Sequence, residues 1–115
     1  MSGGRNNNKA RGYQLEREAV LAAQAAGLEA GRVFASGAFK EQLGEDFAGD
    51  VVIEGLRCEM KRRKGGFKLL YDSFQQDSAD VVCVRADRSP RMYLLREETF
   101  HELLKRAKER EDGIK

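Results

Sequence analysis

Residues 50–64 read DVVIEGLRCEMKRRK, and this stretch decides the fold. The run DVVIEG at 50–55 is rich in β-branched residues and predicts a strand that ends at Gly55. In the run LRCEMK at 56–61, apolar and charged side chains alternate, which predicts a second strand with one apolar and one charged face. Because the two runs meet without a spacer, we expect an antiparallel hairpin that turns around Glu54 and Gly55.

Periodic segments on both sides extend this hairpin into an α/β domain. The expected elements are a helix from about Tyr13 to a C-cap at Gly27, strands at 32–36, 50–55 and 56–61, a helix at 69–79, a buried strand at 80–85, a strand at 92–95 and a helix from Glu97 onward. This α-β-β-β-α-β-β-α order predicts a small mixed β-sheet flanked by helices. We assign residues 11–112 to this single domain and residues 1–10 to a disordered basic tail.

Composition excludes several classes of protein. The chain has 115 residues and a net charge of +2, so one domain is expected and the bulk charge indicates no partner. No apolar run is long enough to span a membrane, and the polar N-terminus is unlike a secretory signal. One histidine and two distant cysteines make a zinc site implausible, and the cysteines fit small core positions in a reducing cytoplasm.

Two carboxylates and an ammonium group fall on one face of the predicted hairpin. Asp50 opens the first strand, while Glu59 and Lys61 lie two residues apart on the second. Two carboxylates and a backbone carbonyl suit Mg²⁺, which prefers oxygen ligands and keeps some waters. Such a metal acidifies a bound water and neutralises charge on a phosphate, and Lys61 could act on that water.

The ordered set of residues resembles the PD-(D/E)xK nuclease superfamily, and most closely the archaeal-type Holliday junction resolvases. The resemblance spans about residues 11–84 and rests on RGYQLEREAV at 11–20, Ser36-Gly37, Gly49-Asp50 in place of Pro-Asp, Glu59-Met60-Lys61, and Tyr71 followed by Gln75 or Gln76. It implies a restriction-endonuclease-like core and an endonuclease that resolves four-way DNA junctions by paired nicks with 5′-phosphate ends.

The resemblance also implies a role for each matching residue. Asp50, Glu59 and the carbonyl of Met60 would hold Mg²⁺, with Mn²⁺ as a substitute, and Glu16 would bind the metal directly or through water. Lys61 would act on the attacking water, and Ser36 would contact the phosphate or its neighbours. Gln75 or Gln76 would be an accessory residue.

Basic residues flank the predicted site along the chain. Six of them against Glu59 alone lie in residues 57–68, and four against Glu16 alone lie in residues 1–17. Each phosphate contact releases counterions, so we expect salt-dependent DNA binding that follows shape more than sequence. The predicted DNA-binding residues are Arg5, Lys9, Arg11, Arg17, Arg62, Arg63, Lys64 and Lys68.

Other interpretations remain open from the sequence. The chain could be a nicking, flap or repair endonuclease of the same fold, or a DNA-binding module without catalysis. Glu59 and Lys61 could be an exposed charge pair, and Glu16 could simply interact with a helix dipole. Because a four-way junction has two-fold symmetry, we expect a C₂ homodimer. The candidate interface elements are the apolar side of the helix at 69–79, with Leu70 and Phe74, and the edge strand at 92–95. The expected location is the cytoplasm of a prokaryotic or phage-infected cell.

Overall fold

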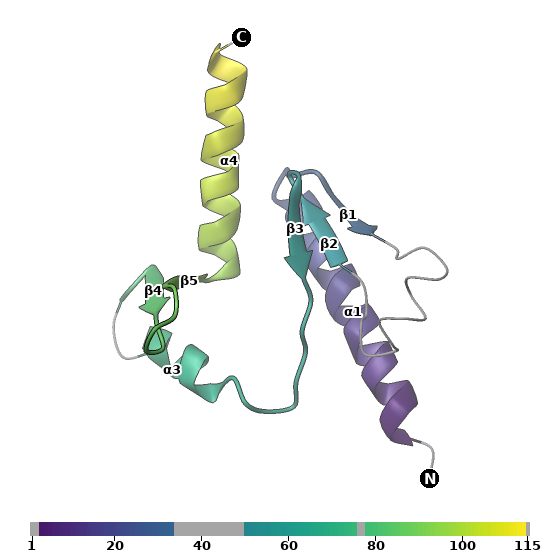
Figure 1. Cartoon of the computed structure of the whole chain (residues 1–115). Helices are drawn as coiled ribbons and strands as arrows, with labels where there is room; N and C mark the ends of the chain where they lie inside the picture. Colours follow the sequence, from purple (N-terminus) through teal and green to yellow (C-terminus); the bar gives the residue numbers. More distant parts are fainter. Residues whose placement is uncertain (1–2, 34–49, 76–77, 115) are drawn as a thin grey trace. The chain divides into compact units, whose positions relative to one another are not determined.

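The computed structural model describes residues 3–33, 50–75 and 78–114, which fall into two compact units, Met1–Arg62 and Arg63–Lys115 (Figure 1). The described elements are α1 (Gly3–Ala25), β1 (Ala30–Val33), β2 (Asp50–Ile53), β3 (Leu56–Glu59), α3 (Lys68–Gln75), β4 (Val81–Val84), β5 (Met92–Leu95) and α4 (Glu97–Ile114). The predicted α/β class is confirmed, and the elements that the structure describes follow the predicted order. No described helix is long and apolar enough to cross a membrane.

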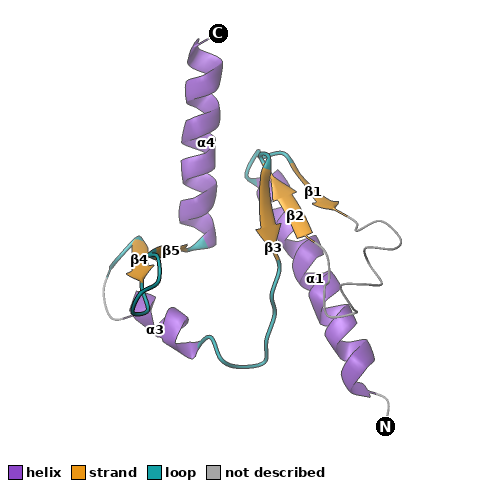
Figure 2. Ribbon diagram, in the orientation of Figure 1, coloured by secondary structure: helices purple, strands orange, loops and turns teal. Residues whose placement is uncertain are grey.

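In the first unit, α1 packs on the three-stranded antiparallel sheet β1-β2-β3 (Figure 2). Val51 and Ile53 lie two residues apart on β2, so both side chains point to the same face of the sheet. Val51 is fully buried and Ile53 is 4% exposed. Ala23 near the end of α1 and Leu28, three residues after the helix, are also buried. These four residues form the buried hydrophobic core of the described chain, and they hold the sheet against the helix.

Helix α1 ends as the sequence predicts. Gly27 has a φ of +85°, Gly27 N–H donates to the Gln24 carbonyl at 3.0 Å, and Leu28 N–H donates to the Ala23 carbonyl at 3.0 Å. This bonding pattern is a Schellman motif, in which a glycine in the left-handed region closes the helix. The apolar pair that usually accompanies this motif is Ala23 and Leu28 here, and both residues belong to the buried core.

The start of α1 differs from the prediction. We expected residues 1–10 to be a disordered tail and the helix to begin near Tyr13, but the helix begins at Gly3. Once a helix has nucleated, each added residue gains a hydrogen bond, so helical backbone can extend beyond the apolar stripe that predicts it. Glu16 therefore lies in the middle of α1, and an interaction with the dipole at the helix N-terminus does not explain it.

The hairpin at residues 50–59 has the predicted turn. Ile53 pairs with Leu56 across β2 and β3, and the two residues between them, Glu54 and Gly55, have φ values of 48° and 81°. Positive φ at both central residues is the pattern of a type I′ turn, which matches the twist of the strands. Glu54 also anchors the turn to Glu29, through its N–H to the Glu29 carbonyl at 2.8 Å and its Oε2 to the Glu29 N–H at 2.6 Å.

The second unit contains α3, the antiparallel hairpin β4-β5 and α4. Arg96 connects α3 to the end of β5, because its guanidinium lies 4.7 Å from the Phe74 ring and its Nη2 donates to the Phe74 carbonyl at 3.1 Å. The expected burial of residues 80–85 is wrong for this structure. Val81 is 39% exposed and Cys83 is exposed, whereas Val82 and Val84 between and after them are half-buried. Because side chains alternate between the faces of a strand, one face of β4 is open and the other is partly covered.

The sheet arrangement also differs from the expected single mixed sheet. The described strands form two antiparallel sheets, β1-β2-β3 and β4-β5. Both hairpins have short connections, and a short connection can only join antiparallel neighbours. The helix expected at 69–79 is described as Lys68–Gln75, and the strand expected at 32–36 is described as Ala30–Val33.

Candidate functional site

Asp50 and Glu59 lie directly opposite each other in the β2–β3 ladder. Cross-strand partners point to the same face of a sheet, with Cβ atoms about 4.5–5.5 Å apart. The alternation along β2 sends Val51 and Ile53 to the face covered by α1, so Asp50 and Glu59 occupy the opposite face. The hairpin register thus brings together the two carboxylates that the sequence placed at a shared site.

Asp50 is the less accessible of the two carboxylates. It is 8% exposed, whereas the Glu59 side chain is 55% exposed. Arg57 Nε donates a hydrogen bond to Asp50 Oδ2, and the Arg57 side chain is itself 73% exposed. The other oxygen, Oδ1, is buried and accepts no hydrogen bond from any residue that the structure describes. A buried carboxylate oxygen without a donor has lost its hydration and has capacity for one more cationic or hydrogen-bonding partner.

The charge on Asp50 acts on a neighbouring thiol. Burial raises the pKa of the Cys58 thiol above its ordinary value, and the negative charge of Asp50 raises this pKa further. Cys58 pairs with Val51, the residue after Asp50, so it lies one step along the ladder from the carboxylate pair. A nearby anion disfavours a second anion, which is the sign expected for a thiol beside an ionised Asp50.

Lys61 and Met60 follow β3 directly. Lys61 Nζ lies 3.9 Å from Glu59 Oε1, and the Lys61 side chain is 65% exposed. This ammonium group is therefore within reach of Glu59 and of solvent. An exposed pair at this distance adds little to stability, so it is available for other contacts.

Glu16 has a different environment from the one that the resemblance implies. It is 1% exposed, and its Oε2 accepts a hydrogen bond from Arg32 Nη2 at 2.8 Å. Arg32 pairs with Val51, so it belongs to the α1 side of the sheet, and its guanidinium lies 4.3 Å from the Tyr13 ring. The structure therefore pairs Glu16 with Arg32 on one side of the sheet, while Asp50 and Glu59 share the other side.

The donor set at Asp50 fits a hard divalent cation in part. The unpartnered Asp50 Oδ1, the Glu59 carboxylate opposite and the Met60 carbonyl are all oxygen ligands, and Mg²⁺ completes its shell with waters. In residues 3–33, 50–75 and 78–114, no three His, Cys, Asp or Glu side chains gather closely enough to hold a metal ion. Two carboxylates are thus brought together, and the third predicted ligand, Glu16, is engaged with Arg32.

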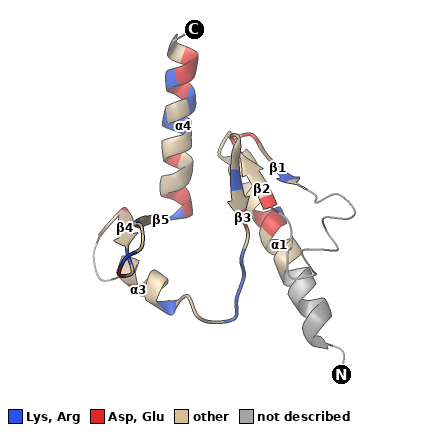
Figure 3. Cartoon of the chain, in the orientation of Figure 1, with Lys and Arg blue, Asp and Glu red and all other residues tan. Residues whose placement is uncertain are grey.

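The basic segment after β3 is exposed from residue 61 to residue 64. Figure 3 shows its lysines and arginines in blue between β3 and α3. Within the first unit, Arg62 Nη1 donates to Gln14 Oε1 at 3.1 Å, which ties the start of this segment to α1. Within the second unit, Arg63 lies 6.0 Å from the Phe67 ring, and Lys68 forms an i,i+4 pair with Asp72 at 2.7 Å.

The remaining predicted residues divide into described and undescribed positions. Arg17 is exposed on α1, Lys64 is exposed, and Gln75 is exposed at the end of α3. Ser36 and Gln76 lie outside the described residues, as do the side chains of Arg5, Lys9 and Arg11. Of the predicted dimer residues, Leu70 and Phe74 are half-buried, whereas Met92 and Tyr93 of β5 are 66% and 65% exposed.

Sequence reasoning missed both arginine partners of the buried carboxylates. Arg57 lies two residues before Glu59 on β3, on the face that carries Asp50, and this spacing was available as a signal. Arg32 had no such signal, because its partner Glu16 comes from a helix far away in the sequence.

We compared the chain with protein-family models, curated proteins and solved structures, and none of the three comparisons gives a match.

Proposed function

We propose that this chain is a Mg²⁺-dependent endonuclease that nicks branched DNA and resolves four-way junctions as a homodimer. One observation carries the proposal: Asp50 and Glu59 are cross-strand partners, and the buried Asp50 Oδ1 has no described hydrogen-bond donor. The proposal includes a restriction-endonuclease-like core for this hairpin, as the resemblance implies.

The proposed roles follow from the chemistry of each group. Asp50, Glu59 and the Met60 carbonyl would hold Mg²⁺, which would acidify a water and stabilise the negative charge of a phosphate under attack. Lys61 lies 3.9 Å from Glu59 and is mostly exposed, and its ammonium group would orient the attacking water and stabilise the negative charge that develops on the phosphate. The exposed Arg62, Arg63 and Lys64 would contact DNA phosphates, which fixes the position of the backbone without reading sequence.

A second function is favoured by a specific observation, namely that an arginine is paired with each buried carboxylate. Ion pairs of this kind neutralise the carboxylates without a metal, as expected for a DNA-binding module that has no catalytic role. The two functions predict the same salt-dependent binding but differ in whether DNA is cut.

The deciding experiment is cleavage of a labelled four-way junction beside a linear duplex and a 5′ flap, in Mg²⁺ and in EDTA. The variants are Asp50→Asn and Glu59→Gln, with Glu102→Gln as the matched carboxylate-to-amide control on the exposed face of α4. Glu59→Gln is the safer of the two active-site variants, because the Glu59 side chain is 55% exposed and its loss leaves no buried group unpaired.

Paired symmetric nicks in the junction, lost in EDTA and in both site variants but kept in Glu102→Gln, are the expected result. Equal cutting of flaps would retain the nuclease and widen its substrate to branched DNA in general. Binding without cleavage in any divalent metal would contradict the enzyme and leave the non-catalytic module. Analytical ultracentrifugation with the junction would test the dimer.

A further inference from the structure

The loop between β4 and β5 borders a hollow of about 470 Å³ in the second unit. Arg85, Arg91, Ser89, Pro90 and Tyr93 line it. The hollow is wide open to solvent, so a ligand there would lie on the surface of the hairpin. Its lining combines cationic groups with one aromatic ring, and none of these residues belongs to the carboxylate site on β2 and β3.

The hairpin register explains why the two arginines converge. Cys83 pairs with Tyr93 and Val84 with Met92, which is the last pair of the ladder. Arg85 directly follows this pair and Arg91 directly precedes it, so both arginines lie at the same end of the hairpin. Like charges close together at one end of a hairpin repel each other, and a bound anion relieves this repulsion.

Both arginines have guanidinium nitrogens available for such an anion. Arg85 Nε donates to the Ser89 carbonyl at 2.9 Å, which fixes the side chain while leaving its Nη atoms for another acceptor. No ion pair involves Arg85 or Arg91 in the described residues, although Asp87 lies in the same loop. The loop at 85–91 holds three arginines against that one aspartate.

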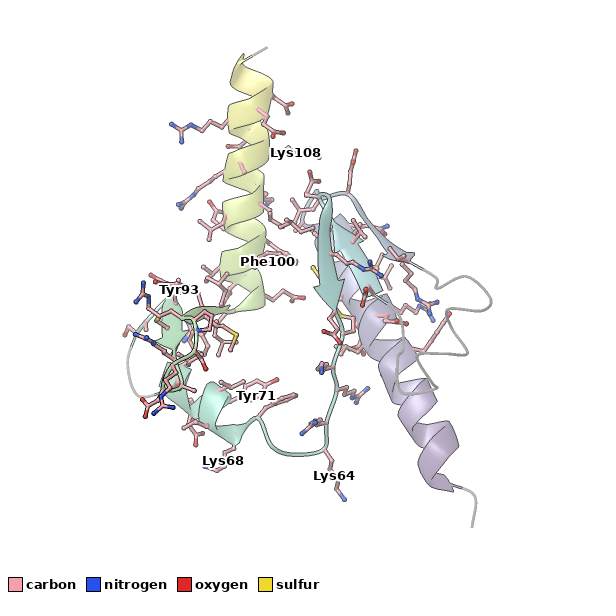
Figure 4. The ribbon with its side chains drawn as sticks, in the orientation of Figure 1. Lys64, Lys68, Tyr71, Tyr93, Phe100 and Lys108 are labelled. Atoms are coloured by element: carbon pink, nitrogen blue, oxygen red, sulfur yellow. The ribbon has the colours of Figure 1, made fainter. Side chains whose placement is uncertain are left out.

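Tyr93 adds a flat apolar surface to the cationic hollow. Tyr93 is 65% exposed on β5. Figure 4 labels it among the side chains of the β4–β5 hairpin. A cationic groove with an exposed aromatic ring is the arrangement on which single-stranded nucleic acids bind, with phosphates on the cations and a base stacked on the ring. A duplex offers phosphates but keeps its bases stacked inside, so the ring favours an unpaired nucleotide.

We infer that the hollow between Arg85, Arg91 and Tyr93 binds one unpaired nucleotide of DNA, with the phosphate on the arginines and the base on the tyrosine. That the nucleic acid is DNA rests on the proposed function, in which a branch point supplies bases outside a regular duplex. The site would then hold the branched strand at a place separate in the chain from the carboxylates.

The test is fluorescence anisotropy of the full chain with a labelled single-stranded oligothymidylate and with a duplex of equal length. It is run in EDTA, so neither metal binding nor cleavage enters the result, and failure of the nuclease proposal would leave this measurement intact. The variants are Arg91→Ala, Tyr93→Ala and Tyr93→Phe. Arg88→Gly is the matched control, because Arg88 carries the same charge in the same loop but does not line the hollow, and its φ of 61° suits glycine.

We expect Tyr93→Ala to weaken single-strand binding at least fivefold, the lower end for loss of one base–aromatic stack, and Tyr93→Phe to stay within twofold of the parent. Arg91→Ala should weaken binding and reduce its salt dependence by about one phosphate contact, and Arg88→Gly should stay near the parent.

The proposal is overturned if Arg88→Gly costs as much as Arg91→Ala, which would indicate diffuse attraction. It is also overturned if Tyr93→Ala changes nothing, which would leave backbone phosphate as the ligand. Circular dichroism of each variant checks folding, and the exposure of Tyr93 makes unfolding by its truncation unexpected.

Discussion

Replacing Arg32 by methionine would remove the guanidinium whose Nη2 lies 2.8 Å from Glu16 Oε2, while keeping most of the aliphatic volume. Glu16 is 1% exposed, so its carboxylate would be left in the interior without this counter-charge. Removing one partner of a buried pair costs about 3–5 kcal/mol. Because 24% of the Arg32 side chain is exposed, water can reach part of the vacated space, and we expect the lower end, about 3 kcal/mol.

Urea unfolding followed by circular dichroism measures this loss. A loss of about 3 kcal/mol would lower the midpoint by about 1–3 M for a small protein. The double variant Glu16→Gln/Arg32→Met should recover most of the stability, since replacing both charges avoids the unpaired carboxylate. Arg106→Met is the matched control: Arg106 pairs with Glu102 at 3.1 Å on exposed α4, so its loss should cost under about 0.5 kcal/mol. A loss below about 1 kcal/mol for Arg32→Met, or a double variant no more stable than the single, would refute the reasoning.

Three further predictions concern the sheet of the first unit and the thiol beside Asp50. Ile53→Ala should cost about 2–5 kcal/mol because Ile53 is 4% exposed, whereas Val81→Ala at a 39% exposed position should cost under about 1 kcal/mol; urea unfolding of both variants compares them. Gly55→Ala should cost about 1–2 kcal/mol of stability, because alanine is strained at the φ of +81° found there; a Cβ at this position would meet no atom within 4 Å, so no steric clash adds to the cost. Gly31→Ala is the control, because a Cβ there also meets no atom but φ is not positive, and it should cost much less. Equal losses for the two variants would contradict the backbone explanation. In a Cys83→Ser background, the rate of Cys58 alkylation should rise at a higher pH in the folded chain than in the unfolded chain, because folding raises the pKa of the Cys58 thiol. Asp50→Asn should move this rise to lower pH, because it removes the negative charge that raises this pKa. The raised pKa also contributes folding stability that is fully present below the pKa of the unfolded thiol and is lost as the pH rises through the pKa of the folded thiol.

Local chemistry predicted the elements whose ends are set by backbone conformation. Gly27 closes α1 and Gly55 turns the hairpin, both with positive φ, and each was identified from the residue type and its neighbours. The pairing of Asp50 with Glu59 then follows from the turn, because a two-residue turn fixes the register of the strands it joins. The sequence could predict this part of the site because every link in it is local.

Packing between distant segments was not predictable in the same way. Among the described side chains of α1, the fully buried ones are the charged Glu16 and the small Ala23. Analysis of hydrophobic periodicity places glutamates on the solvent-exposed face of a helix, so it does not predict a buried helix face that includes Glu16. That face is buried because Arg32 supplies the counter-charge from β1, and such a partner is visible only once the chain has folded.

Asp50 shows how the same hairpin can serve either proposed function. Its carboxylate is nearly buried, so it needs a positive charge nearby in every state of the protein. Arg57 supplies that charge to Oδ2, but the Arg57 side chain is 73% exposed and can leave toward solvent at little cost in burial. Oδ1 is already without a described donor and faces the same side of the sheet as Glu59. A divalent cation bound there would therefore take the place of the Arg57 charge. Asp50 would have a positive partner both before and after the metal binds, so the ion pair with Arg57 is consistent with the proposed metal chemistry.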